Sequence, residues 1–275
     1  MTAAELRKAG VEILKSAGFD APRHECDYLL SGALGMPLLE LCLVPALEIA
    51  APQCDRILEM FRRRAQHEPA QYILGSAPFR ELELTVTQAV LIPRPETEEL
   101  VTLALKLAPV NGKVLDMGTG SGAIPIALKY ERPDLQLTAS DLSPEALKIA
   151  QLNAGRYQTD IEFIHSDLWQ NLSERSFDLV TANLPYVSEE EYKECSKEIF
   201  FEPVMALTAP HNGLALMEKM ISELHAHLLP GGAAIFELSH TQNPMICAFG
   251  RSMNFKAESV RDLEGKARFV ILYKE

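Results

Sequence analysis

The segment Lys113-Val-Leu-Asp-Met-Gly-Thr-Gly-Ser-Gly122 decides the fold that we expect for this chain. It begins with apolar residues typical of the end of a buried strand and continues with three alternating glycines, Gly118, Gly120 and Gly122. Alternating glycines reach positive φ without strain and allow the backbone to approach a ligand closely. Residues 123–130 have the composition of a helix that starts directly after them, and the first N–H groups of a helix are unpaired. The segment therefore predicts a nucleotide-type pocket at the carboxyl end of a parallel sheet.

The glycines alone leave the ligand of this pocket open. Gly118, Gly120 and Ala123 also satisfy the G-x-G-x-x-G/A pattern of dinucleotide sites, and the same residues could form a turn that binds nothing. Asp116 separates these interpretations, because a carboxylate before the first glycine can hold a cationic amino group, directly or through water, but repels a pyrophosphate. The pattern D-x-G-x-G-x-G resembles that of S-adenosylmethionine (AdoMet) methyltransferases, so AdoMet is the ligand that we favour.

Length, composition and charge limit the classes of protein to consider. The chain has 275 residues, 47% of them hydrophobic, which allows a sizeable core in one large domain or in two smaller ones. No apolar run reaches the length of a membrane span and no signal-peptide stretch is evident, so we expect a cytoplasmic protein without membrane contact. Five scattered cysteines, never spaced C-x-x-C, indicate reduced thiols and no metal site. The net charge of −12 disfavours direct binding of nucleic acid and suits a basic protein partner.

Residues 1–72 are predicted to form a helical N-terminal domain. Thr2 is a suitable cap for a first helix that ends at Gly18, and a second helix is predicted from Pro22 to Gly35. Their apolar residues recur at helical spacing, so each helix should bury one face against the others.

A third predicted helix of this domain ends in the consecutive arginines 62–64. They form either a solvated helix end stabilised by the helix dipole or a contact surface for RNA or a partner protein. Residues 73–94 are predicted to be a linker, with a β-hairpin over Phe79–Ile92 where apolar residues alternate. Arg94 and Glu96, next to two prolines, are either a surface ion pair or part of the pocket edge.

Residues 95–275 alternate between strands and helices in the manner of an α/β protein. Strands are predicted over 135–140, 161–164, 177–182 and 233–238, and helices over 143–154, 211–229 (closed by Gly231-Gly232) and 243–252. The last strands, 255–261 and 268–273, are predicted to form a hairpin that makes one strand antiparallel. The expected fold class is α/β: a Rossmann-like, mostly parallel, doubly wound sheet of the class I methyltransferase type, with a small helical N-terminal domain and a β-hairpin linker.

Acidic residues at the same sheet edge are candidate cofactor contacts. Asp141 ends a strand about twenty residues after the glycines, where an acidic side chain can accept both ribose hydroxyls. Asp167 follows the next strand and could accept a hydrogen bond from an adenine amine, with Leu168 or Trp169 packed on the ring. For Trp169 an equal alternative is a packed aromatic side chain whose N–H is satisfied inside the protein.

The tetrapeptide Asn183-Leu184-Pro185-Tyr186 follows the strand 177–182, so it lies on the sheet edge of the glycine loop. Pro185 restricts Leu184 to extended geometry, which aims the carbonyl of Leu184 outward, as the amide oxygen of Asn183 is aimed. Two such acceptors can bind both hydrogens of a planar NH₂ group while Tyr186 lies flat on that group. The alternative is an Asx-type turn that ends a strand.

This arrangement suits a weak nitrogen nucleophile such as an amide. Acceptors that hold both hydrogens favour the charge that develops as the nitrogen attacks, and in-line placement against a sulfonium methyl supplies much of the remaining acceleration. No strong base is needed, in agreement with the absence of an obvious His or Lys at the motif. We therefore assign the catalytic role to Asn183, Pro185 and Tyr186.

Over essentially its whole length the chain resembles the HemK/PrmC-type release-factor glutamine methyltransferases. The proline-rich stretch Leu91 to Leu100 is the most diagnostic mark, because the glycine loop alone would fit any class I methyltransferase. The other marks are Glu68-Pro69, Gln71 to Ile73, Gly75, Phe201 to Pro203, Ala206-Leu207, Asp262-Leu263 and Arg268 to Val270.

The resemblance implies an AdoMet-dependent protein-glutamine N-methyltransferase that acts in translation termination. The methyl group would pass to the side-chain amide nitrogen of the glutamine in the Gly-Gly-Gln loop of class I peptide chain release factors, leaving S-adenosyl-L-homocysteine. The helical domain would dock the factor, and we expect a monomer. The implied AdoMet contacts are Gly118, Thr119, Gly120, Ser121, Gly122, Asp141, Asp167, Leu168 and Asn183. The implied glutamine contacts are Asn183, Leu184, Pro185 and Tyr186.

Two positions depart from the family pattern. Leu184 stands where the family has the first proline of Asn-Pro-Pro-Tyr, and Asn-Leu-Pro-Tyr is more often seen in ribosomal-RNA adenine dimethyltransferases. Two alternatives therefore stay open: an adenine-amine methyltransferase acting on RNA or DNA, and a catalytically silent AdoMet-binding module. Ser239, where the family commonly has glycine, carries no functional meaning that we can assign.

Overall fold

The structure is a computed structural model that describes residues 1–275, and the chain divides into two compact units. The first unit consists of Met1–Ser76 and Ser196–Phe201, and the second of Ala77–Cys195 and Glu202–Glu275. No pattern in the sequence had predicted that Ser196–Phe201 packs with the first unit. The predicted domain ranges, 1–72, 73–94 and 95–275, stay a prediction.

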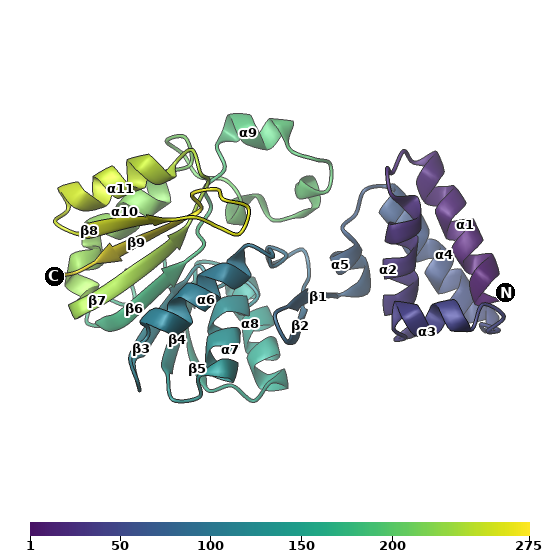
Figure 1. Cartoon of the computed structure of the whole chain (residues 1–275), viewed down its shortest axis with the longest axis horizontal. Helices are drawn as coiled ribbons and strands as arrows, with labels where there is room; N and C mark the ends of the chain where they lie inside the picture. The colour runs from purple at the N-terminus through teal and green to yellow at the C-terminus, as the bar shows by residue number, and fades with distance from the viewer. The chain divides into compact units, whose positions relative to one another are not determined.

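The first unit is helical. Thr2 caps its first helix in a capping box, because the Thr2 side chain accepts from the N–H of Glu5 and the Glu5 carboxylate accepts from the N–H of Thr2. Gly35 ends the second helix in the left-handed region, at φ 63°. The α-helices are α1 (Ala3–Ser16), α2 (Pro22–Leu34), α3 (Leu38–Leu43), α4 (Ala51–Ala65) and α5 (Ala70–Leu74) (Figure 1). The unit also contains the 3₁₀ turn η1 (Ile199–Phe201).

The arginines at the end of α4 differ from one another, which corrects the interpretation of residues 62–64 as a uniformly solvated helix end. Arg62 is exposed and pairs with Glu59, but Arg64 is buried. The Arg64 guanidinium forms ion pairs with Glu25 and Glu198 and lies over the ring of Phe19. A buried arginine with two carboxylate partners holds Ser196–Phe201 to the helices of its own unit.

The hairpin occurs earlier than predicted. Its strands are β1 (Ser76–Phe79) and β2 (Leu82–Thr85), and the residues that follow Thr85 form no strand. The Asn153 side chain accepts from the N–H of Thr85 and donates to its carbonyl, so these backbone groups bind a helix side chain at the point where the second strand ends.

The second unit contains a seven-stranded sheet in the order β5-β4-β3-β6-β7-β9-β8 (Figure 1). β9 runs antiparallel to both of its neighbours, β7 and β8, as predicted for the last hairpin, and all other neighbouring pairs are parallel. The strands are β3 (Lys113–Met117), β4 (Gln136–Asp141), β5 (Ile161–His165), β6 (Phe177–Ala182), β7 (Leu228–Glu237), β8 (Lys256–Val260) and β9 (Phe269–Tyr273).

Apolar side chains fill the space on both faces of this sheet. Val114 and Leu115, neighbours on β3, belong to two separate hydrophobic clusters because successive strand residues point to opposite faces. The helices and 3₁₀ turn are α6 (Thr97–Leu107), α7 (Ala123–Glu131), α8 (Pro144–Arg156), α9 (Glu189–Glu194), η2 (Val204–Ala206), α10 (Ala215–His227) and α11 (Asn243–Ser252). The predicted α/β fold class is therefore confirmed, and no helix is both long and apolar enough to cross a membrane.

Gly231-Gly232 does not close a helix, contrary to the prediction. Helix α10 ends at His227, and the two glycines lie inside β7, where the pairing with β6 shifts register. A Cβ on Gly232 would lie 2.9 Å from the carbonyl oxygen of Leu229 and 3.0 Å from that of Asp178. The glycines therefore allow the extra residues of β7 to bulge against β6.

Candidate active site

The glycine loop connects the central strand β3 to helix α7. Gly118, Gly120 and Gly122 have φ values of 74°, 55° and 81°, which side chains other than glycine rarely adopt. A Cβ on Gly118 would lie 2.7 Å from Cδ2 of Leu184, whereas a Cβ on Gly120 would meet no atom within 4 Å. The loop is therefore packed against the protein at Gly118 and open at Gly120.

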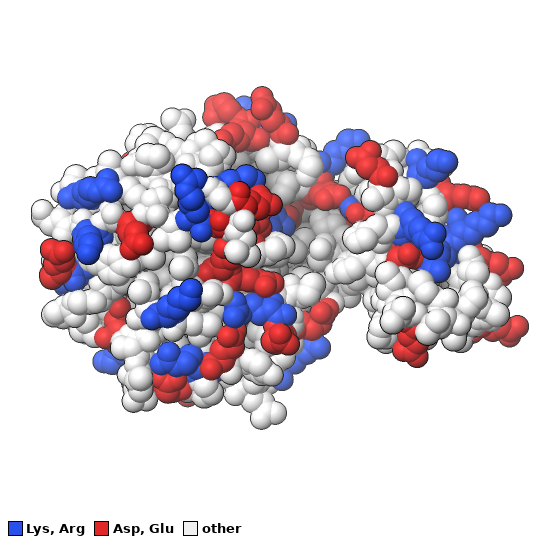
Figure 2. Space-filling view, viewed as in Figure 1, with Lys and Arg blue, Asp and Glu red and all other residues white.

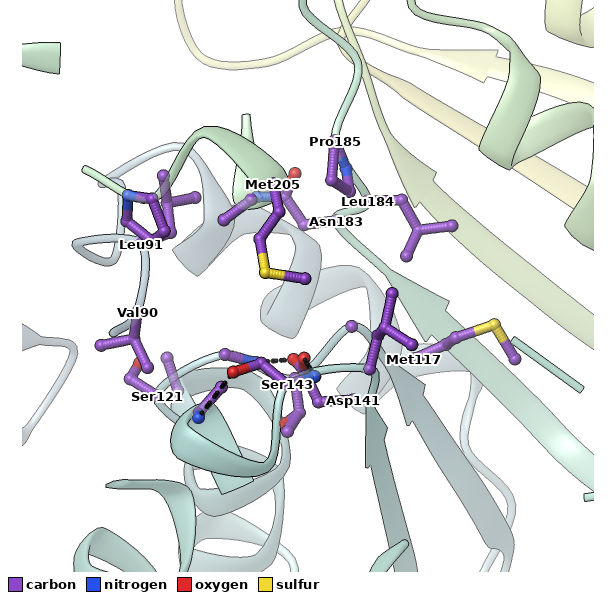
Figure 3. Close-up of a pocket in the computed structure, with 18 of the residues that line it drawn as sticks. Val90, Leu91, Met117, Ser121, Asp141, Ser143, Asn183, Leu184, Pro185 and Met205 are labelled. Carbon is purple, nitrogen blue, oxygen red and sulfur yellow. Dashed lines mark hydrogen bonds between the residues drawn. The ribbon is translucent and has the colours of Figure 1, made fainter. Parts of the chain in front are cut away.

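An open cavity lies over this loop, with about 1060 Å³ of empty space that is partly continuous with solvent. Figure 3 shows Asp141 and Ser143 on one side of it and Asn183, Leu184 and Pro185 on the other, with the Met205 side chain extending into the space between. Most predicted site residues line it, namely Gly118, Thr119, Gly120, Ser121, Asp141, Asp167, Leu168, Asn183, Leu184 and Pro185. Gly122 and Tyr186 do not line it.

Asp116 is fully buried and does not line the cavity. Its Oδ1 accepts a hydrogen bond from the Thr181 hydroxyl at 2.8 Å. Burial raises the pKa of Asp116 to about 7, against the effect of its hydrogen bonds. The carboxyl group thus lies behind the glycine loop and not in the cavity wall.

Asp141 stands at the end of β4 and holds the loop. Its Oδ2 accepts from the N–H of Gly120 and its Oδ1 from the N–H of Ser143, both at 2.8 Å. Burial raises the pKa of Asp141, and these backbone hydrogen bonds oppose the shift. A carboxylate has about four lone-pair positions, so two acceptor positions stay available to a ligand.

The structure decides between the two interpretations of Trp169. Its Nε1–H donates to the carbonyl of Met220 at 2.9 Å, and its ring stacks on His227 with the centroids 4.1 Å apart. Trp169 is therefore a packed aromatic residue outside the cavity, whereas Leu168 and Asp167 line it. Of the three residues proposed to contact the adenine ring, Leu168 is therefore the one that can provide an apolar contact.

Asn183, directly after β6, brings an amide group to the cavity wall. Its Nδ2 donates a hydrogen bond to the hydroxyl of Thr97 at 3.1 Å. Tyr186 is partly buried against the core on the α10 side of the sheet. Burial and then the charge of Glu237 raise the pKa of Tyr186 to about 12, so this side chain is neutral and not a base near pH 7.

Sequence reasoning did not find the supporting roles of two residues, Glu202 and Thr97, whereas it had named Arg94 as a candidate for the pocket edge. Glu202 is buried; its Oε1 pairs with Arg94 at 2.6 Å and its Oε2 accepts from the N–H of Ile92. Arg94 therefore lines the cavity and does not pair with Glu96, which faces Arg268 instead. Thr97 and Glu202 contact residues 86 and 108 positions away, so no local pattern could have indicated these contacts.

The sheet order, the single antiparallel strand and the glycine loop after the central strand define a class I AdoMet-dependent methyltransferase. Residues 97–213 match the family described as methyltransferase small domain, and residues 5–75 match the PrmC N-terminal domain. The fold is similar to that of a methyltransferase from Pyrococcus furiosus, with a TM-score of 0.56 and 18% identity over 82% of this chain and 99% of that one.

Relatives with higher identity narrow this class to one family. The release factor glutamine methyltransferase of Koribacter versatilis is 37% identical over 98% of both chains. That of Lactococcus lactis is 40% identical over 81% of this chain and 84% of its own length. The chain belongs to the release factor glutamine methyltransferase family, which confirms the resemblance seen in the sequence.

Proposed function

We propose that this protein transfers the methyl group of AdoMet to the side-chain amide nitrogen of the glutamine in the Gly-Gly-Gln loop of a class I peptide chain release factor. The observation that carries the proposal is the shared cavity, in which Asn183, Leu184 and Pro185 face the glycine loop and Asp141 (Figure 3). Family membership supports both the cofactor and the substrate class.

The residues over the glycine loop fit AdoMet. The open space at Gly120 allows a ligand to approach the backbone, and the free acceptor positions of Asp141 suit two ribose hydroxyls. Asp167 and Leu168 supply an acceptor and an apolar surface for the adenine. When bound, AdoMet supplies an electrophilic methyl group on a sulfonium.

The Asn183 side chain and the Leu184 carbonyl would hold the substrate amide. Thr97 occupies the Nδ2 of Asn183, which leaves the Oδ1 as the free acceptor for one hydrogen of the glutamine amide. The backbone carbonyl of Leu184 would accept the second hydrogen. Both contacts strengthen as the nitrogen gains positive charge, and no side chain has to remove a proton before the attack.

Pro185 and Tyr186 complete the substrate-binding proposal. Pro185 stiffens the backbone that presents the two acceptors. Tyr186 does not line the cavity, so flat packing of its ring on the glutamine amide would need the bound loop to reach past Pro185. We keep Tyr186 as a predicted contact on the basis of the family motif alone.

The proposed partner is the release factor itself, docked by the helical first unit. Figure 2 shows acidic side chains gathered over α9, where Glu189, Glu190, Glu191 and Glu194 lie in six residues. With the net charge of −12, this surface repels a nucleic-acid backbone and favours a basic protein surface. A cytoplasmic monomer is part of this proposal.

One labelling experiment with two substrates distinguishes this function from its two alternatives. The protein is mixed with methyl-labelled AdoMet and either a release factor or ribosomal RNA. Label on the Gly-Gly-Gln peptide of the factor supports the proposal. Label on RNA would favour the adenine-amine methyltransferase suggested by Asn-Leu-Pro-Tyr, and label on neither would favour a silent AdoMet-binding module.

A further inference from the structure

Behind Asn183 lies a buried carboxyl group that the proposed reaction does not use. Glu237 is the last residue of β7 and is 1% exposed. Its Oε2 has no hydrogen-bond partner, which is costly for a buried carboxyl group and therefore calls for an explanation. Ala182 pairs with Phe236 across the parallel strands β6 and β7, so the next residues along the chain, Asn183 and Glu237, lie side by side.

Thr97 connects these two residues. It is the first residue of α6, it is buried, and its Oγ1 accepts the hydrogen bond from Nδ2 of Asn183 at 3.1 Å. The Thr97 side chain also lies close enough to the carboxyl group of Glu237 to lower the pKa of that group. Asn183, Thr97 and Glu237 therefore form a chain of three polar groups that runs from the cavity wall into the protein.

We propose that Thr97 and Glu237 are positioning residues that orient the amide of Asn183 so that its Oδ1 faces the substrate; this inference rests on the proposed function. A carboxylate only accepts hydrogen bonds, so the single proton of the Thr97 hydroxyl is directed to Glu237. The hydroxyl oxygen is then left to accept from Nδ2 of Asn183. A flipped amide would compete for the hydroxyl proton and leave the Glu237 carboxylate with no donor, so the buried charge selects one of two orientations.

Charged and titratable groups around Glu237 act on its carboxyl group. Arg268 and Arg94 favour the carboxylate, whereas Glu96 disfavours it. Tyr186 is also close enough for the charge of Glu237 to act on it. Burial is the largest effect and raises the pKa of Glu237 to about 7, so the acceptor required by the arrangement is present in full only above neutral pH.

The orientation can be measured without any turnover. In full-length protein labelled with ¹⁵N-asparagine, the side-chain NH₂ signals of Asn183 are assigned by their loss in Asn183→Ala. We expect one slowly exchanging proton on this group in the wild type and in Thr97→Ser. In Thr97→Val its exchange should be at least about tenfold faster, because one hydrogen bond is lost. Thr102→Val removes a hydroxyl from the same helix, away from the cavity, and should change nothing.

Kinetics then test whether the orientation matters for methyl transfer. Thr97→Val and Glu237→Gln should lower kcat by about tenfold or more, with KM values for AdoMet and release factor within about twofold of wild type. Thr97→Ser should restore kcat. In an Asn183→Ala background, Thr97→Val should have no further effect, because its action passes through Asn183.

Wild-type exchange at Asn183 in Thr97→Val, failure of Thr97→Ser to restore exchange and kcat, or an undiminished effect of Thr97→Val in the Asn183→Ala background would each overturn the inference. If the wild type does not methylate the release factor, the proposed function fails, and the exchange measurement still decides whether Thr97 orients Asn183.

Discussion

Replacing Gly118 by alanine tests how the glycine loop and Leu184 depend on each other. Gly118 has a φ of 74°, and an alanine there costs about 1 kcal/mol in backbone strain. The new Cβ would lie 2.7 Å from Cδ2 of Leu184, a side chain that is only 5% exposed and packed in the core. Such overpacking costs about 1–3 kcal/mol, so Gly118→Ala should destabilise the protein by about 2–4 kcal/mol in total.

Gly120→Ala is the matched control. Gly120 also has a positive φ, of 55°, but a Cβ there meets no atom within 4 Å. Its cost should therefore be limited to the backbone contribution of about 1 kcal/mol. Because Gly120 lines the cavity, this variant should instead weaken the binding of AdoMet.

Thermal unfolding of the ligand-free protein distinguishes the two variants. At about 2–4 °C per kcal/mol for a domain of this size, Tm should fall by roughly 5–15 °C in Gly118→Ala and by about 2–4 °C in Gly120→Ala. Combining Gly118→Ala with Leu184→Ala should cost less than the sum of the single changes, because the leucine that clashes is gone. Equal losses in the two glycine variants, or strict additivity with Leu184→Ala, would refute this account of the loop.

Three further predictions concern cofactor binding by Asp141, the buried carboxyl group of Asp116, and Leu184 in the Asn-Leu-Pro-Tyr motif. Asp141→Ala should weaken AdoMet binding by about 1–3 kcal/mol in a calorimetric titration; unchanged affinity would remove its role at the ribose. Burial raises the pKa of Asp116 from its ordinary 3.8 to about 7, so between these values the folded protein holds a proton that the unfolded chain has lost. Its contribution to the free energy of unfolding therefore falls as pH rises from about 4 to 7. In urea unfolding, Asp116→Asn should therefore show a weaker dependence of the free energy of unfolding on pH than the wild type. An identical pH dependence would contradict the raised pKa of Asp116. Leu184→Pro should keep or raise turnover, because the Leu184 N–H donates no hydrogen bond and the carbonyl at 184 is retained; a large loss would mean that Leu184 serves a different substrate.

Local sequence patterns were sufficient to predict most of the elements that build the sheet, although β7 begins five residues earlier than predicted. The strand 177–182 and the helix 243–252 have the predicted limits, because apolar residues and flanking turn residues mark both. The glycine loop and the antiparallel last hairpin were also confirmed. These features depend on residues that are close together in the sequence.

The features that the sequence did not predict depend on distant partners. The second strand of the first hairpin ends at Thr85, whose backbone groups bind Asn153, 68 residues later. The glycines 231 and 232 resemble a helix stop but are needed for a bulge against β6. The residues that support the site follow the same rule, because Thr97 contacts Asn183, which lies 86 residues later in the sequence.

The most direct test of the account locates the transferred methyl group and its dependence on Asn183. Release factor treated with AdoMet and either the wild-type protein or Asn183→Ala is digested, and the Gly-Gly-Gln peptide is sequenced by mass spectrometry over time. The account predicts a single methyl group on the glutamine amide nitrogen and a rate about 10²-fold lower with Asn183→Ala, the usual effect of removing a preorganised hydrogen-bonding group. A methyl group on any other atom, or an unchanged rate with the variant, would contradict it.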